Sequence, residues 1–224
     1  MIIAGIDEAG RGPCFGPMVI SIASIEKKNE IKLKEIGVKD SKDLTAKQRE
    51  EMFDQLKEVT KSKTKVLSAV EINDLMTHEN LNEIEAITIA NLINEFSEKI
   101  DELFIDSPDV TKGKFEGRIR QYLNKEKQGI KIVAENKADS KYLITGAASI
   151  IAKVTRDNEI KELAKKYGDF GSGYPSDPYT KRYLEEYVEK NKKLPPFSRI
   201  FWSTCTKALE KLEENKESSQ SKLF

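Results

Sequence analysis

MIIAGIDEAGRGPCFGPMVISIASI, residues 1–25, decides how the fold begins. Its first residues are apolar and predict a buried strand that ends in two acids, Asp7 and Glu8. A turn rich in glycine and proline follows over residues 9–17, and residues 18–25 predict a second apolar strand. Because this connection is too short for a helical crossover, we expect the two strands to pair antiparallel.

Beyond residue 25, predicted helices alternate with predicted strands. The polar stretch 27–34 indicates a loop or hairpin end, and Thr45 with Gln48 forms a capping-box pattern that predicts a helix start. Apolar periodicity predicts strands at 64–71, 102–106 and 130–135, and helices from 83 to 100, around 115–123, from 140 to 165, around 183–188 and around 202–212. Since helices separate the later strands, those strands can be parallel. The order predicts a mixed α/β sheet with helices on both sides and a C-terminal helical cap.

Composition bounds the class of protein. The chain has 224 residues, of which 34% are charged and 38% hydrophobic, so it can bury a core as a soluble globular protein. The sequence has no apolar run near the ~18 residues of a membrane helix, and its start lacks the basic and apolar segments of a signal peptide. We therefore expect a cytoplasmic protein. Its zero net charge leaves nucleic-acid binding open, because phosphates need only a local basic face.

Histidine and cysteine usage restricts the chemistry. His78 is the only histidine, which disfavours a zinc site or a Ser-His-Asp mechanism. Cys14 and Cys205 have no second metal ligand at CxxC or CxxH spacing, so we interpret them as buried or half-buried thiols. Acid–base or metal chemistry must therefore depend mostly on carboxylates.

Four acids stand out because of their positions. Asp7 and Glu8 end the first strand, Asp106 ends a later one, and Asp139 lies in a turn before the long helix. Functional groups gather at strand ends in open α/β sheets, so neighbouring strands would bring these carboxylates into one cleft. Oxygen ligands suit Mg²⁺ or Mn²⁺, and two such ions about 4 Å apart can activate water and stabilise the leaving oxygen of a phosphodiester. Any one of these acids could instead be a cap or turn residue, and Asp139 could be an N-cap.

Six blocks in order resemble the ribonuclease HII family, in its archaeal type, which is similar to the catalytic subunit of eukaryotic ribonuclease H2. They are GIDEAGRGPCFGPMV at 5–19, KDSKDLT at 39–45, FIDSPD at 104–109, ENKADSKY at 135–142, AASIIAKVTRD at 147–157 and GSGYPSDP at 171–178. The resemblance implies a ribonuclease H-like fold with a mixed five-stranded sheet. It also implies hydrolysis of RNA in RNA–DNA hybrids and incision 5′ of single ribonucleotides in duplex DNA, leaving 3′-hydroxyl and 5′-phosphate ends. Such an enzyme would serve ribonucleotide excision repair and DNA replication.

The resemblance also assigns roles to residues. By position, Asp7, Glu8, Asp106 and Asp139 match the family's metal-binding acids, and Asp7 would bridge two Mg²⁺ or Mn²⁺ ions. Three further sets match or suit substrate binding: Gly10, Arg11 and Gly12 as the loop that reads the ribose 2′-hydroxyl, Tyr174 against the sugar, and Lys39, Lys42 and Lys137 as phosphate contacts. Taken alone, the glycines could form a tight turn, Tyr174 could anchor a loop and the lysines could be solvated surface.

The sequence also predicts domain boundaries and one candidate partner. We expect a catalytic core over 1–165, a helical cap over 166–216 and a flexible tail over 217–224. In the tail, Gln220, Leu223 and Phe224 have a spacing like the start of a sliding-clamp binding peptide, although the sequence slightly favours a frayed end. A monomer is the simplest expectation. No role follows from sequence for Arg199.

Two rival functions remain open at this stage. Another two-metal enzyme on the same fold, such as a resolvase, a transposase or a proofreading exonuclease, would share the acids but have no use for a loop that reads a 2′-hydroxyl. A non-catalytic RNA–DNA or nucleotide-binding module would use AGRG as a phosphate loop. However, the sequence has no G-x-x-x-x-G-K-[ST], and the glycine turn leads into a strand rather than a helix.

Overall fold

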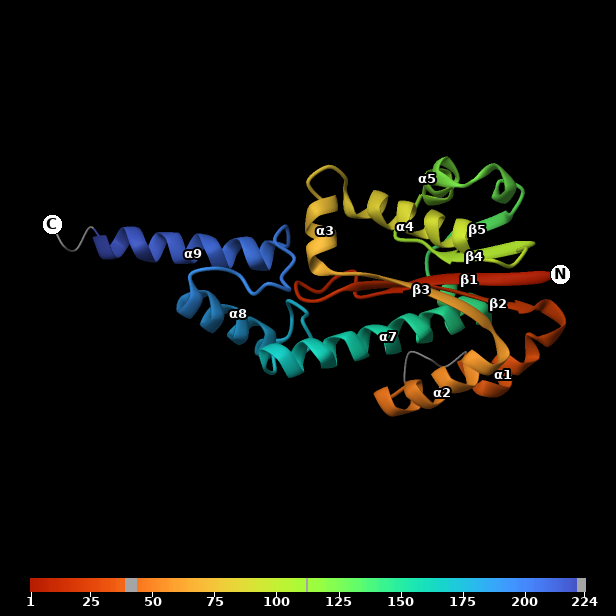
Figure 1. The fold of residues 1–224 in the computed structure, drawn as a ribbon, viewed down its shortest axis with the longest axis horizontal. Coiled ribbons are helices and arrows are strands. Elements are labelled where there is room, and N and C mark those ends of the chain that lie inside the picture. Colours follow the sequence, from red (N-terminus) through yellow and green to blue (C-terminus); the bar gives the residue numbers. More distant parts are fainter. Residues whose placement is uncertain (39–43, 112, 221–224) are drawn as a thin grey trace. The chain divides into compact units, whose positions relative to one another are not determined.

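The protein contains a five-stranded mixed sheet. The structure, a computed structural model, describes residues 1–38, 44–111 and 113–220. The strand order is β3-β2-β1-β4-β5, with β1 (Ile2–Ala9), β2 (Met18–Glu26), β3 (Lys61–Leu67), β4 (Glu102–Asp106) and β5 (Lys131–Glu135) (Figure 1). β1 pairs antiparallel with β2, whereas β1 and β4, and β4 and β5, pair parallel. The predicted sheet and its strand directions are therefore confirmed.

The described residues also form helices. They are α1 (Ile31–Ile36), α2 (Ala46–Val59), α3 (Ala69–Leu75), α4 (Leu81–Glu95), α5 (Lys114–Tyr122), α6 (Ala138–Lys141), α7 (Leu143–Tyr167), α8 (Pro178–Asn191) and α9 (Ser203–Gln220), with short 3-10 turns at Lys27–Asn29 and Lys125–Lys127. Figure 1 shows α4 and α5 on one side of the sheet and α1, α2 and the first half of α7 on the other. The predicted capping box of α2 is present, because Thr45 Oγ1 accepts the Gln48 N–H while Gln48 Oε1 accepts the Thr45 N–H.

Several predicted element boundaries are wrong. The strand predicted over 64–71 ends at Leu67, because Ser68 caps α3: its hydroxyl accepts the Glu71 N–H at 3.1 Å, and Glu71 accepts the Ser68 N–H at 2.8 Å. The loop predicted at 27–34 contains a 3-10 turn and the start of α1, which buries Leu33. The long helix predicted from 140 is interrupted at Tyr142, which has an extended backbone between α6 and α7.

The chain divides into two compact units. The first comprises Met1–Ala9, Val19–Val66 and Glu79–Asp157, and it contains a core in which strand residues such as Ile3 and Ala23 pack with α7. The second comprises Gly10–Met18, Leu67–His78 and the residues from Asn158 onward, and its core gathers aromatic side chains around Phe15. Within the described part of the chain, no helix is both long enough and apolar enough to cross a membrane.

Glycine lets α7 approach β1 very closely. A Cβ on Gly5 would lie 2.4 Å from the backbone carbon of Ile144 and 2.4 Å from the backbone nitrogen of Thr145. Thr145 is fully buried and donates its hydroxyl to the Phe104 carbonyl of β4 at 3.2 Å. The first turn of α7 therefore rests directly on the backbone of β1, two residues before Asp7. This contact positions the helix that covers the acidic end of the strand.

Candidate active site

Three acids meet at one edge of the sheet. Asp7 lies near the end of β1, Glu8 follows it, and Asp106 ends the parallel neighbour β4. Each offers a carboxylate oxygen, and these oxygens all lie within 4.8 Å of one another. The register explains the convergence, because Ile6 pairs with Ile105 and the next residue on each strand is an aspartate. Three of the four acids that were predicted from their strand-end positions therefore lie together in the structure.

Asp7 is buried among like charges. Its exposed fraction is 6%, and its Oδ1 accepts the Glu8 N–H at 2.8 Å. Burial raises the pKa of Asp7 well above its usual value, and the charges of Glu8 and Asp106 raise it further. The nearby Ser149 hydroxyl of α7 lowers the pKa, although its geometry falls short of a hydrogen bond. Without a cation, an ionised Asp7 is therefore costly to the fold.

The donor set fits hard divalent cations. The three clustered ligands are carboxylates, and neither cysteine nor histidine is among them. Mg²⁺ and Mn²⁺ prefer such oxygen ligands, and their charge would offset the repulsion that raises the pKa of Asp7. The arrangement can therefore hold metal ions at the end of the sheet.

Asp139 lies beside this cluster rather than within it. It is the second residue of α6, and the preceding N–H, that of Ala138, donates to Asp106 Oδ1 at 2.7 Å. Its side chain accepts the Ser140 hydroxyl at 3.2 Å. The alternative interpretation of Asp139 as an N-cap is wrong, because Lys137 occupies the N-cap position with a left-handed backbone at φ 61°.

Glu135 ends β5 at the same edge but is occupied by other partners. It pairs with Asp106 in the sheet register, accepts the Tyr142 hydroxyl at 2.7 Å and forms an ion pair with Lys141 at 2.9 Å. These contacts give it a structural role. Lys137 is exposed, whereas Lys39 and Lys42, predicted to contact phosphates, lie outside the described residues.

The predicted reading loop and Tyr174 are neighbours within the second unit. Gly10 has φ 82°, a conformation that favours glycine, and a Cβ on Gly12 would lie 3.7 Å from the Tyr174 ring. Gly173 connects the two segments, because its carbonyl accepts the N–H groups of Cys14 and Phe15 at 2.9 and 3.3 Å. Tyr174 is 41% exposed, so its ring is accessible beside the loop.

Sequence reasoning missed two residues that hold this loop. Arg199 is completely buried, and its guanidinium donates to the carbonyls of Gly10, Arg11 and Gly16. Trp202 donates its indole N–H to the Gly12 carbonyl at 3.0 Å. Backbone carbonyls carry no sequence signal, so these partners could not be found without the fold. Cys14 and Cys205 are buried thiols in the same core, which confirms that interpretation.

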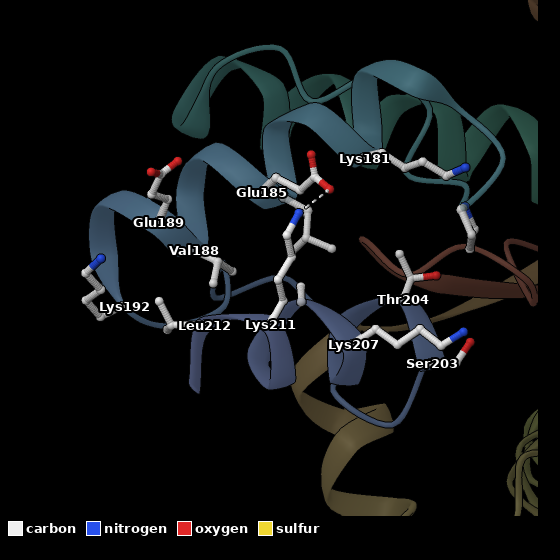
Figure 2. Close-up of a pocket in the computed structure, with 13 residues that line it drawn as sticks. Lys181, Glu185, Val188, Glu189, Lys192, Ser203, Thr204, Lys207, Lys211 and Leu212 are labelled. Carbon is white, nitrogen blue, oxygen red and sulfur yellow. Dashed lines mark ion pairs between the residues drawn. The ribbon is translucent and has the colours of Figure 1, made fainter. Parts of the chain in front are cut away.

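A groove between α8 and α9 was also missed. Its volume is about 1030 Å³, and Leu184, Val188 and Leu212 are among its lining residues. Lysines rim it, and Lys211 forms an ion pair with Glu185 at 3.7 Å across it (Figure 2). None of the predicted site residues that the structure describes lines this groove.

Comparisons with known proteins agree with the architecture. The family model described as Ribonuclease HII matches residues 4–205. The chain is 45% identical to Ribonuclease HII of Methanocaldococcus jannaschii over 96% of this chain and 98% of the relative, and 46% identical to that of Pyrococcus horikoshii over 96% of each.

Solved structures show the same similarity. The crystal structure of ribonuclease H2 from P. horikoshii superposes with a TM-score of 0.88 at 45% identity, covering 95% of this chain and 99% of that one. The ribonuclease HII of Archaeoglobus fulgidus, solved in a complex with PCNA, gives a TM-score of 0.83 at 36% identity, covering 92% and 96%.

Proposed function

Because this chain belongs to the ribonuclease HII family and is a metal-dependent ribonuclease H, we propose that it also incises duplex DNA on the 5′ side of a single embedded ribonucleotide. Like other ribonucleases H, it hydrolyses the RNA strand of RNA–DNA hybrids. The observation that carries the proposal is the approach of Tyr174 to the loop of Gly10, Arg11 and Gly12, where a Cβ on Gly12 would lie 3.7 Å from the tyrosine ring. The metal site is supported by the cluster of Asp7, Glu8 and Asp106, whose carboxylate oxygens lie within 4.8 Å of one another.

The four acids divide the metal-binding work. Two Mg²⁺ or Mn²⁺ ions, when bound, would supply a hydroxide nucleophile and stabilise the leaving 3′ oxygen, which leaves 3′-hydroxyl and 5′-phosphate ends. Asp7, the most buried of the four acids, would hold the metal ions together with Glu8 and Asp106. Asp139 would complete the set from α6, whose first residue, Ala138, donates its N–H to Asp106.

Recognition of the ribonucleotide is assigned to the adjacent loop. Gly10, Arg11 and Gly12 would contact the 2′-hydroxyl through backbone groups, and Tyr174 would pack against the sugar. The 3.7 Å approach between a Cβ on Gly12 and the Tyr174 ring supports this pairing.

A sliding clamp is a further proposed partner. The A. fulgidus relative was solved in a complex with PCNA, and this chain ends with Gln220, Leu223 and Phe224 at a spacing like the start of a clamp-binding peptide. Calorimetric titration of the full chain with an archaeal clamp should show binding that Phe224→Ala weakens. Equal affinity of the two chains would contradict the assignment.

Cleavage of a labelled DNA duplex with one ribonucleotide tests the main proposal. We expect incision 5′ of the ribonucleotide with Mg²⁺ or Mn²⁺, none with EDTA, and at least about 100-fold slower cleavage by Asp7→Asn. Asp54→Asn is the matched control, because Asp54 is an exposed residue of α2. Metal-dependent cutting of all-DNA duplexes at the same rate would instead favour a resolvase-like or exonuclease-like function. Tight hybrid binding without cleavage would favour a binding module.

A further inference from the structure

Arg199 joins the C-terminal segment to the loop that contains Gly10, Arg11 and Gly12. Its side chain is completely buried. Its Nη2 donates to the Gly10 carbonyl at 2.6 Å, Nη1 to the Arg11 carbonyl at 3.1 Å and Nε to the Gly16 carbonyl at 2.9 Å. A guanidinium carries its donors in a fixed planar fork, so these three bonds fix the relative positions of three carbonyls.

Neighbouring groups complete this arrangement. The Arg199 N–H donates to the Cys14 carbonyl at 2.8 Å, and the Arg199 guanidinium lies 4.9 Å from the Trp202 ring, whose N–H binds the Gly12 carbonyl. Residues 199 and 202 thus bind the carbonyls of residues 10, 11, 12, 14 and 16.

Peptide geometry shows what these bonds orient. In a trans peptide unit the C=O and the following N–H point in opposite directions. The Gly10 carbonyl shares its peptide plane with the Arg11 N–H, and the Arg11 carbonyl shares its plane with the Gly12 N–H. Because Arg199 binds both carbonyls, it directs these two N–H groups to the opposite side of the loop. Such a pair of amides can donate to a sugar oxygen, and their direction depends on one buried side chain.

We propose that Arg199 is a positioning residue for ribose recognition: by holding the Gly10 and Arg11 carbonyls, it orients the two backbone amides that select a 2′-hydroxyl. This inference rests on the proposed reading role of the loop. It extends that role to a side chain that lies behind the loop and does not touch the substrate. Loss of Arg199 should therefore reduce the preference for ribose, while the acids of the first unit keep their affinity for metal.

The test measures a ratio of rates, which does not depend on how much enzyme is folded. Two duplexes would carry either one ribonucleotide or one 2′-fluoro nucleotide at the same position. Hydrolysis 5′ of this nucleotide breaks a bond that does not involve its 2′ substituent, so both duplexes are chemically cleavable. Wild-type protein should prefer the ribonucleotide, and in Arg199→Lys the ratio of kcat/KM values should fall roughly 10- to 100-fold, since lysine lacks the fork. Mn²⁺ affinity by calorimetry should stay unchanged.

Arg182→Lys is the matched control, because Arg182 lies exposed on α8 and stacks over Tyr179. If Arg199→Lys does not fold, Trp202→Phe keeps an aromatic ring but removes the N–H bond to Gly12, and the ratio should then fall about 3- to 10-fold. An unchanged ratio in the folded variants, or an equal loss on both duplexes, overturns the positioning role while leaving the proposed function intact. A wild-type protein with no ribose preference overturns both.

Discussion

Gly5→Ala should damage catalysis without touching a catalytic residue. The added Cβ would lie 2.4 Å from the backbone of Ile144 and Thr145, where ordinary contacts begin at 3.4 Å, so the start of α7 or β1 must move by about 1 Å. Backbone atoms cannot rotate away as the end of a side chain could. Asp7 lies two residues along β1, on the same face of the strand as Gly5, and therefore shares the displacement.

The expected magnitude follows from this movement. Forcing a methyl group into a packed interior costs about 1–3 kcal/mol of stability, and more where rigid backbone must yield. A displacement of about 1 Å at catalytic groups can reduce the rate roughly 100-fold. We therefore expect a loss of at least about 1 kcal/mol in the free energy of unfolding. We also expect a much larger loss of kcat than unfolding alone would cause.

Urea denaturation and cleavage of the single-ribonucleotide duplex measure the two effects. Gly129→Ala is the matched control, because nothing lies within 4 Å of a Cβ at Gly129 and it adds the same methyl group without strain. That control should stay within about 0.5 kcal/mol of the wild type and cleave normally. Wild-type cleavage by folded Gly5→Ala would refute the claim that the contact between β1 and α7 sets the position of Asp7.

Three further outcomes are expected. In EDTA, Asp7→Asn should stabilise the protein near pH 7, because burial raises the folded pKa of Asp7 and makes its ionised form unfavourable. That penalty is present above the folded pKa and disappears below the unfolded value of about 3.9, so urea unfolding should show the advantage shrinking towards pH 4. Thr45→Ala should cost about 1 kcal/mol in thermal or urea unfolding, and Thr45→Ser much less, because only alanine removes the cap of α2. Cys14 and Cys205 should resist alkylation in the native protein and react after unfolding, as mass spectrometry would show.

Local rules predicted much of the sheet and most of the acids. An apolar strand, a turn too short for a crossover and helices between later strands were enough to give the strand directions. Asp7 and Asp106 converge because parallel strands in register end at one edge. The missed start of α3 was also local: Ser68 and Glu71 carry a capping-box spacing within an apolar run that was interpreted as strand.

The contacts of Arg199 could not be predicted in this way. The carbonyls that it binds are separated from it by 183 to 189 residues, and backbone oxygens are the same in every sequence. A buried arginine is also rare enough that composition favours placing it on the surface. Family resemblance identifies the loop of Gly10 to Gly12, but the shape of that loop depends on a tertiary contact.

Asp7 and Arg199 are both buried ionisable groups, but different neighbours stabilise their charged forms. Arg199 is stabilised by carbonyl dipoles of the protein itself, so its arrangement requires no ligand. Asp7 faces other carboxylates, and its ionised form needs a cation to offset their repulsion. Removing metal should therefore disturb the acids while leaving the reading loop in place. The proposed ribose recognition would then be built into the fold, whereas the proposed metal centre would be completed when metal binds.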